Sequence, residues 1–306
     1  MNKIQHLIAH IGAPKTASTS IQHIIKMNKN IVEESGYSFW GPDEIRFHET
    51  WGDIFSGYYR NNYSVDLRKC TKNFFKKSKK NKILLSEESL THDLMPSQWG
   101  EGKFARIERT CDIIESMADN ISIILCIRRQ DDFLISTYNH LLHRHGLMVG
   151  FEEWLLNNIQ ITQLSWLSVI DKLEKRFGRK NLTIVPFEYI KKGIDIFLKS
   201  MLKNTNINTE KFNYDYSIKN PSLNVGGANL AIEVNKLLRM YPKKRELLIS
   251  DIINRTSDCS FDQDEKKFKE IKQNLSVLLA QIYADENHSI EKEWFFQKCP
   301  EFYFSK

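Results

Sequence analysis

Short apolar runs alternate with longer stretches of helical spacing along the first 200 or so residues of the chain. Four apolar runs predict buried strands, at about 5–11, 82–85, 121–127 and 181–187. Apolar residues that recur every three or four positions predict helices at about 18–35, 65–80, 103–119, from 131, 151–158, 165–177 and 194–202. This alternation predicts an α/β fold with a three-layer, doubly wound parallel sheet of about four to five strands.

The remainder of the chain is mostly helical in pattern. One apolar stripe with a period of 3.6 residues is formed by Phe268, Ile271, Leu275, Leu278, Leu279 and Ile282. Such a stripe is typical of a helix that packs against a core. We therefore expect a single domain over 1–306, with an α/β core at 1–205 and a mostly helical C-terminal part at 206–306.

The first strand leads into a loop that offers hydroxyl groups and one ammonium group. The loop and the following helix start contain Pro14, Lys15, Thr16, Ala17, Ser18, Thr19 and Ser20. The unpaired N–H groups and the dipole of a helix N-terminus favour an anion, which predicts a phosphate site. A Walker A loop would place its lysine directly before the helix, whereas Lys15 comes early and Ala17 stands where glycine is usual. An ordinary strand-to-helix turn is the alternative.

A second set of anion-binding groups follows the third predicted strand. Arg128 and Arg129 come directly after this strand, and Ser136 lies in the next predicted helix. A guanidinium fork and a hydroxyl at the carboxyl end of a central strand can bind a second phosphate. Pairing with Asp131 or Asp132 is the alternative, and it suits one of the two arginines better than both.

Candidate proton acceptors lie at two places. Glu87 and Glu88 follow the strand at 82–85, where a carboxylate can take a proton from an acceptor hydroxyl. Neighbours on an extended strand point to opposite faces, so only one of the two can face a given cleft. His48 lies in an aromatic-rich stretch, 36–63, that also contains Trp40, Trp51, Tyr58 and Tyr59. These side chains either hold a ligand or pack in the core.

The composition is that of an ordinary globular protein with a basic surplus. Of its 306 residues, 41% are hydrophobic, and the formal net charge is +6, which suits an anionic ligand. The five cysteines lack CxxC spacing, which predicts reduced thiols and a cytoplasmic location. We find no secretory signal and no apolar run long enough to span a membrane. A lysine-rich stretch at 65–80 forms a solvated face or steers an acidic partner, and without a nucleic-acid motif we expect no nucleic acid.

The two anion-binding elements together resemble those of sulfotransferases that use 3′-phosphoadenosine 5′-phosphosulfate (PAPS). GAPKTASTSIQ at 12–22 is similar to the phosphosulfate loop of that family. IRRQDDFLISTYNHLL at 127–142 is similar to its 3′-phosphate element, in which a serine follows an arginine by eight positions, as Ser136 follows Arg128. The resemblance covers about the first 190 residues and is closest to bacterial members that act on carbohydrates. Ala17 and Ser18 depart from the usual Gly-Thr, and the RKGxxG clamp of animal cytosolic members is absent.

The resemblance implies a role for each matched residue. Lys15 would stabilise the bridging oxygen of the leaving phosphate, the loop from Pro14 to Ser20 would hold the 5′-phosphate, and Arg128 with Ser136 would hold the 3′-phosphate. Glu88 would be the base, with Glu87 and His48 as alternatives.

The family's chemistry implies PAPS as donor, 3′-phosphoadenosine 5′-phosphate (PAP) as product and no metal. The acceptor would be a hydroxyl group on a saccharide, and a homodimer is compatible with the sequence. A P-loop nucleotide or sugar kinase, which would need ATP and Mg²⁺, is the alternative enzyme. A non-catalytic module that binds anionic glycans is the alternative of another class.

Overall fold

The structure is a computed structural model of the chain. It describes residues 4–51, 54, 66–71, 74–75, 78, 80–94, 96–97, 100–101, 107–215, 223–256 and 262–303. Tyr58 and Tyr59, which were candidate ligand-binding aromatics, lie outside the described residues.

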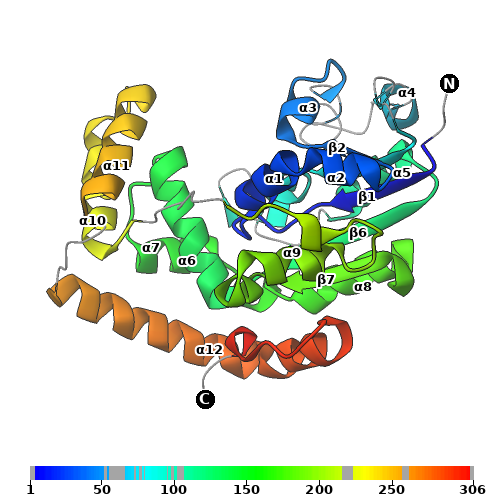
Figure 1. Ribbon diagram of the computed structural model, residues 1–306. Helices are drawn as coiled ribbons and strands as arrows, with labels where there is room; N and C mark the ends of the chain where they lie inside the picture. Colours follow the sequence, from blue (N-terminus) through cyan, green and yellow to red (C-terminus); the bar gives the residue numbers. More distant parts are fainter. Residues whose placement is uncertain are drawn as a thin grey trace.

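A five-stranded parallel sheet forms the centre of the fold (Figure 1). Its strands are β1 (His6–His10), β2 (Tyr37–Trp40), β3 (Lys82–Ser86), β6 (Ile121–Ile127) and β7 (Leu182–Pro186). They lie in the order β2-β3-β1-β6-β7, so β1 is central, with Ala9 beside both Leu85 of β3 and Ile123 of β6. The predicted α/β fold class and parallel sheet are confirmed. Because all five strands are parallel, their carboxyl ends meet at one edge of the sheet.

Edge strand β2 was not predicted as a strand. Its four residues, YSFW, are all buried and pair with β3 alone. The segment is short and lies between Gly36 and Gly41, and its aromatic residues resembled a ligand-binding loop in the sequence. Tyr37, Phe39 and Trp40 are instead part of the hydrophobic core. A further antiparallel pair is formed by β4 (Pro96–Ser97) and β5 (Gly100–Glu101).

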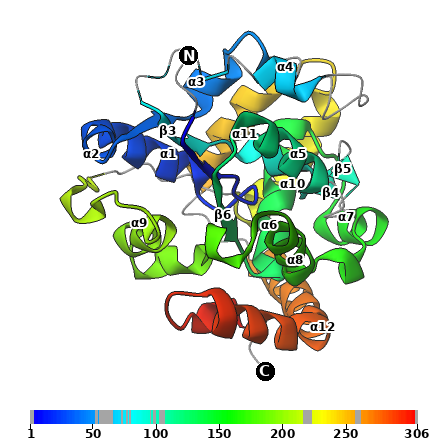
Figure 2. The same ribbon diagram turned by 90° about the vertical axis from the view of Figure 1, so that its right-hand side faces the viewer.

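Helices cover both faces of the sheet. Those of the α/β part are α1 (Ser18–Met27), α2 (Lys29–Glu34), α3 (Pro42–Arg46), α4 (Leu67–Thr71), α5 (Ile107–Met117), α6 (Gln130–His140), α7 (Phe151–Asn158), α8 (Trp166–Phe177) and α9 (Ile194–Leu202). Helices α1, α2 and α9 lie on one face, and α5 and α8 lie on the other (Figure 2). The helix predicted over 18–35 is divided at Asn28, whose side-chain amide donates to the carbonyl oxygens of Ile24 and Asn213.

The described residues of the C-terminal part include the α-helices α10 (Val225–Leu237), α11 (Pro242–Thr256) and α12 (Asp262–Trp294). The buried row of α12 contains Leu275, Leu279, Tyr283, Asn287 and Ile290. The predicted inclusion of Leu278 and Ile282 in that row is wrong, since their side chains are 42% and 39% exposed. The row continues through the polar Asn287, which bonds to Gln130 of α6, and a count of apolar residues alone overlooks this. Among the described residues, no helix is long and apolar enough to cross a membrane.

Candidate functional site

The loop between β1 and α1 has positive φ angles, which are relaxed for glycine and strained for other residues. Gly12 has φ +40°, and a side chain there would come within 3.2 Å of both His10 Nε2 and Ser18 Oγ. Lys15 and Ala17 have φ +67° and +64°, in the left-handed region that costs non-glycine residues about 1 kcal/mol or more each. Such conformations persist where the surrounding structure holds them, and they often occur at ligand sites.

Two buried threonines anchor this loop. Thr16 Oγ1 donates to the carbonyl oxygen of Ala13 at 2.6 Å. Thr91 Oγ1, on the turn after β3, lies within hydrogen-bond distance of the carbonyl oxygens of Ile11 and Gly12. The Thr16 hydroxyl proton is therefore committed to shaping the loop.

The first turn of α1 is free of side-chain capping. Its N-cap residue is Ala17, which has no side chain able to accept a hydrogen bond from the first N–H groups. Ser18 Oγ is buried and is among the described polar atoms that have no hydrogen-bond partner. Ser20 is half-buried and Thr19 is exposed. An anion at this N-terminus would give partners to the N–H groups and to the Ser18 hydroxyl.

Arg128 lies beside this loop, at the end of β6. Its Nη1 donates to the carbonyl oxygen of Lys15 at 3.1 Å, and its guanidinium carbon lies 4.3 Å from the centre of the Phe187 ring. Its Nε is buried and, like Ser18 Oγ, has no partner among the described residues. Ser136 lies in α6, half-buried. The Nη1 of Arg128 thus fixes the side chain to the Lys15 backbone, while its Nε has no partner among the described residues.

Arg129 has a different environment from its neighbour. Its guanidinium pairs with both carboxylate oxygens of Asp131, at 2.7 and 3.0 Å. Its Nη1 donates to the carbonyl oxygens of Glu301 and Tyr303, both at 3.0 Å. Pairing with Asp131, which was the alternative to phosphate binding for these arginines, therefore applies to Arg129. Its other hydrogen bonds hold the last described turn of the chain against α6.

Charged groups gather around Lys15. Burial lowers the pKa of its ammonium, the carboxylate of Glu88 opposes this shift, and the cations Arg128 and Arg144 add to it. Burial, Arg144 and Lys15 likewise lower the pKa of His143. The structure thus brings together Lys15, Arg128 and Glu88, as predicted groups of one site, and adds two residues that sequence reasoning missed.

His143 and Arg144 belong to a π turn (Leu141–His145) that continues α6. A π turn rotates the side chains that follow it away from the regular helical face, so periodicity did not indicate their direction. The run His143-Arg144-His145, directly before Gly146, was the available signal. Single π turns in α-helices are frequent at functional sites.

Glu87 and Glu88 point to different surroundings, as expected for neighbours after a strand. Glu87 is fully buried and accepts two hydrogen bonds from Arg46, at 3.0 and 2.8 Å, and one from the N–H of Ser89 at 3.0 Å. Glu88 is half-buried and close enough to Lys15 to act on its pKa. Glu87 is therefore paired with Arg46 through both carboxylate oxygens, whereas Glu88 lies near enough to both Lys15 and Arg46 to raise their pKa values.

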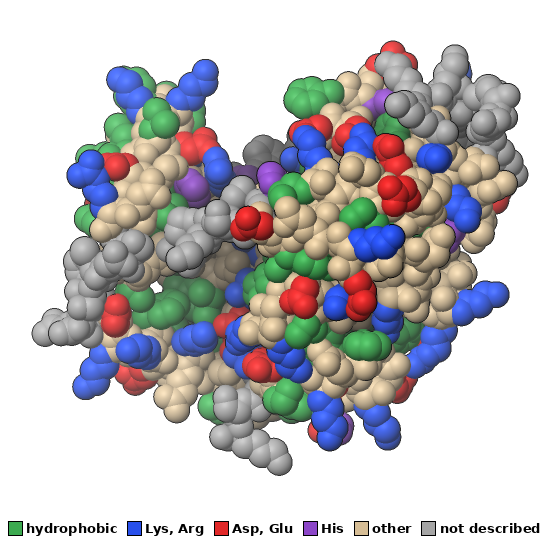
Figure 3. Space-filling model, viewed as in Figure 1, with side chains coloured by type: hydrophobic (Ala, Val, Ile, Leu, Met, Phe, Trp, Pro, Cys, Tyr) green, Lys and Arg blue, Asp and Glu red, His purple; other side chains and the backbone are tan. Residues whose placement is uncertain are grey.

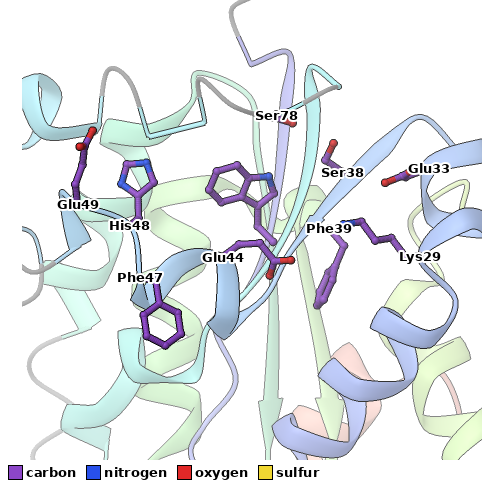
Figure 4. A pocket seen from close by; sticks show the side chains of 10 residues that line it. Lys29, Glu33, Ser38, Phe39, Glu44, Phe47, His48, Glu49 and Ser78 are labelled. Carbon is purple, nitrogen blue, oxygen red and sulfur yellow. The ribbon is translucent and has the colours of Figure 1, made fainter.

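His48 lies at a separate place, in a cavity of about 500 Å³ beside edge strand β2 (Figure 4). Figure 4 shows Phe47, His48 and Glu49 on one side of this cavity and Lys29 and Glu33 of α2 on the other. Its described lining comprises Lys29, Glu33, Ser38, Phe39, Trp40, Glu44, Phe47, His48, Glu49 and Ser78. The His48 ring is 4.5 Å from that of Phe74, and its Nδ1 is 2.9 Å from Thr50 Oγ1. Lys15, Glu88 and Arg128 are not among the lining residues.

Two further titratable groups are buried under the site. His10 lies below Gly12, with Nδ1 2.8 Å from Ser86 Oγ and Nε2 3.5 Å from Cys126 Sγ, and burial lowers its pKa to about 4. Glu188 follows β7 and accepts a hydrogen bond from the Arg129 N–H at 2.9 Å, and burial raises its pKa to about 7. Among the described residues, no group of three or more His, Cys, Asp or Glu side chains is arranged to hold a metal ion.

Comparisons with known proteins give similarities of structure alone. No protein-family model and no curated protein sequence matches the chain. A sulfotransferase from Alicyclobacillus acidocaldarius is similar over 81% of this chain and 95% of its own, with a TM-score of 0.44 and 11% identity. The mouse sulfotransferase SULT7A1 complexed with PAP is similar over 95% of this chain and 89% of its own, with a TM-score of 0.38 and 12% identity.

A gluconokinase from Sinorhizobium meliloti is similar over 66% of this chain and 95% of its own, with a TM-score of 0.31 and 12% identity. Similarities at this level carry no argument about activity, and the site is interpreted from its own residues.

Proposed function

We propose that the chain is a sulfotransferase that transfers a sulfuryl group from PAPS to a hydroxyl group of a saccharide. The observation that carries the proposal is the hydrogen bond from Arg128 Nη1 to the carbonyl oxygen of Lys15. It joins the loop after β1 to the arginine after β6, so both sequence elements that resemble PAPS-binding motifs lie side by side. They lie at the carboxyl ends of the adjacent parallel strands β1 and β6. The chain leaves β1 towards β2 and leaves β6 towards β7, in opposite directions across the sheet, and such a point is the usual ligand position in parallel sheets.

The residues present fit a ligand with two phosphate groups. Ser18 Oγ and Arg128 Nε are buried donors that have no partner within the part of the chain that the structure describes, and buried polar groups in native proteins are nearly always satisfied. The N–H groups and hydroxyls of Ser18, Thr19 and Ser20 would hold the 5′-phosphate, within the loop that Pro14, Thr16 and Ala17 shape. Arg128 and Ser136 would hold the 3′-phosphate.

When bound, the donor supplies a sulfuryl group activated by its attachment to the 5′-phosphate. The Lys15 ammonium, partly removed from water, would balance the negative charge that develops on the departing phosphate oxygen. Glu88 would accept the proton of the acceptor hydroxyl, because it is the half-buried carboxylate close to Lys15. Glu87 is engaged by Arg46, and His48 lies in the cavity beside β2, so we assign neither as the base.

The saccharide acceptor rests on the sequence resemblance to bacterial carbohydrate sulfotransferases. A cytoplasmic location is part of the same proposal, and Cys111, Cys126 and Cys299 are free buried thiols, as expected there. The homodimer and the single-domain organisation stay predictions.

The first test compares nucleotides by thermal shift. PAP, without added metal, is expected to raise the melting temperature, and ATP with Mg²⁺ is expected to leave it nearly unchanged. The reverse result would establish the kinase alternative in place of this proposal. Stabilisation by neither nucleotide, together with salt-sensitive binding of sulfated glycans, would favour the binding module.

The second test separates the candidate groups by paired variants. Lys15→Ala and Glu88→Gln are each expected to lower the rate of sulfuryl transfer at least a hundredfold. PAP is still expected to raise the melting temperature of Glu88→Gln. Glu87→Gln is the matched control, because it weakens the buried pair with Arg46. It is expected to lower the melting temperature and to leave the transfer rate of the folded enzyme nearly unchanged. Full activity of Lys15→Ala would refute the assignment.

A further inference from the structure

Helices α10 and α11 form a hairpin that stands apart from the α/β core (Figure 1). Three large apolar side chains are exposed at its tip: Leu237 at 79%, Met240 at 81% and Tyr241 at 57%. Leu247, on the first turns of α11, is 72% exposed and extends this apolar surface. Single exposed apolar residues are normal, but several within a few positions of a projecting turn mark a site of interaction.

Cationic side chains surround the same apolar residues. Residues 236–245 read KLLRMYPKKR and contain no acidic residue. Lys236, Arg239, Lys243 and Lys244 are all exposed, and the Lys244 ammonium lies 5.4 Å from the centre of the Tyr241 ring. Lys236 forms an ion pair with Glu233 at 2.7 Å, so Arg239, Lys243 and Lys244 carry the positive charge of the tip. Figure 3 shows Lys and Arg side chains together with hydrophobic ones at the end of this projection. The tip is thus both apolar and positively charged.

The tip has a defined backbone. The N–H of Tyr241 donates to the Leu238 carbonyl oxygen at 2.8 Å, and the N–H of Arg245 donates to the Tyr241 carbonyl oxygen at 2.9 Å. Pro242 begins α11. An ordered turn loses little further conformational freedom when it binds a surface, because its backbone is already fixed.

We propose that this hairpin tip docks on an anionic lipid bilayer. Leu237, Met240 and Tyr241 enter the boundary between headgroups and acyl chains, and the cations Arg239, Lys243 and Lys244 contact lipid phosphates. Apolar side chains ringed by lysine and arginine have the chemistry of interfacial membrane anchors. A second copy of the chain is a poorer occupant, since a two-fold contact through the tip would place Arg239, Lys243 and Lys244 against the same three cations of the other copy.

The hairpin is joined to the candidate active site through the π turn. The side-chain amide of Asn235 in α10 donates to the carbonyl oxygens of Leu142 and Leu147, at 3.0 and 2.6 Å. His143 Nε2 lies 3.1 Å from Ser250 Oγ of α11, and Arg144 forms an ion pair with Glu246. Docking at the tip therefore fixes how the π turn is oriented relative to the membrane. It also fixes the orientation of the hollow that Figure 3 shows between the hairpin and the core.

The test is co-sedimentation of the full chain with phosphatidylcholine vesicles that contain or lack phosphatidylglycerol. Binding is expected only with the anionic lipid. Lys243→Glu with Lys244→Glu is expected to weaken it about thirtyfold or more, given the usual contribution of each cation near an anionic surface. Met240→Ser with Tyr241→Ser is also expected to weaken it. This readout needs no nucleotide and does not depend on the sulfotransferase proposal.

Matched controls come from other exposed positions. Lys266→Glu with Lys267→Glu makes the same change of charge on α12, and Leu156→Ser removes a side chain that is 78% exposed on α7. Both are expected to bind like the unaltered chain, and melting temperatures verify that every variant is folded. Equal binding to neutral vesicles, equal loss in the controls, or no binding at all would overturn the proposal. So would a dimer in sedimentation velocity that the tip variants dissociate without any vesicle binding.

Discussion

The guanidinium of Arg128 donates a 3.1 Å hydrogen bond to the carbonyl oxygen of Lys15. Two segments more than a hundred residues apart are thereby held together at the carboxyl edge of the sheet. The carbonyl group that accepts this bond belongs to Lys15, whose backbone is in the left-handed region. Arg129, the next residue, has its donors committed to Asp131 and to the carbonyl oxygens of Glu301 and Tyr303. Adjacent arginines thus have different roles: Arg128 has a buried Nε that finds no partner among the residues described, and Arg129 is structural.

This division makes Arg128→Ala and Arg129→Ala a matched pair. Arg128→Ala is expected to weaken PAP binding by about 10- to 100-fold, the range for a lost charge-assisted hydrogen bond, with a small change in stability. Arg129→Ala leaves the buried Asp131 carboxylate without its ion pair and is expected to lower the free energy of unfolding by about 3 kcal/mol. Calorimetric titration with PAP and urea denaturation measure the two quantities. Equal effects of the two variants on both would contradict the division.

Ala17 offers a test of backbone strain. Its φ of +64° lies in the region that glycine adopts without cost, so Ala17→Gly is expected to raise the free energy of unfolding by roughly 1 kcal/mol. Ala17→Val is expected to lower it, because branching at Cβ worsens the same clash. Ala284→Gly, at an exposed position in α12, is the control, and there glycine is expected to destabilise by about 1 kcal/mol. Destabilisation by Ala17→Gly would count against strain at this position.

His10 predicts a loss of stability in acid. Its pKa is lowered to about 4 in the folded chain, so the unfolded chain binds a proton near pH 6.5 that the folded chain refuses until about pH 4. The free energy of unfolding therefore falls as pH decreases from 6.5 to 4, by up to roughly 3 kcal/mol from this group. His10→Asn keeps a polar partner for Ser86 and is expected to remove this part of the pH dependence. An unchanged slope in urea titrations of the variant would contradict the shift.

Glu188 predicts the opposite slope. Its pKa is raised to about 7, so the folded chain retains a proton that the unfolded chain releases near pH 4.5. Stability from this group is complete below pH 4.5 and is lost as pH rises through 7, by roughly 3 kcal/mol. Glu188→Gln should remove this loss, with Glu152→Gln on the surface of α7 as the control for one lost charge. Because the two slopes oppose each other, each must be measured as a difference between variant and unaltered chain across pH.

Much of the fold could be predicted from the sequence because it depends on local patterns. The strands at 82–86, 121–127 and 182–186 consist mainly of apolar residues, and such segments are typical of strands covered on both faces. Strand β2 was missed because four residues are too few to show a period, and its burial depends on pairing with β3. The row on α12 was misplaced because its register depends on contacts with α6 and α8.

The candidate site was predictable in part for the same reason. The positions of Lys15, Arg128 and Glu88 follow from strand ends, which the sequence marks. The environment of each group cannot be predicted from strand ends. Glu87 and Glu88 are equivalent in the sequence, and only the structure shows that Arg46 pairs with Glu87. His143 and Arg144 depend on a π turn, whose altered direction has no periodic signature in the sequence.

The contacts of Arg129 with the carbonyl oxygens of Glu301 and Tyr303 have a consequence for biosynthesis. Lys15 and its loop leave the ribosome early, and Arg128 follows more than a hundred residues later. Arg129, the neighbour of Arg128, gains its partners at Glu301 and Tyr303 only when residue 303 has been made. The five strands of the sheet, the last of which ends at Pro186, can therefore pair before synthesis ends, whereas the contacts that hold the last described turn against α6 form only after nearly the whole described chain has been released.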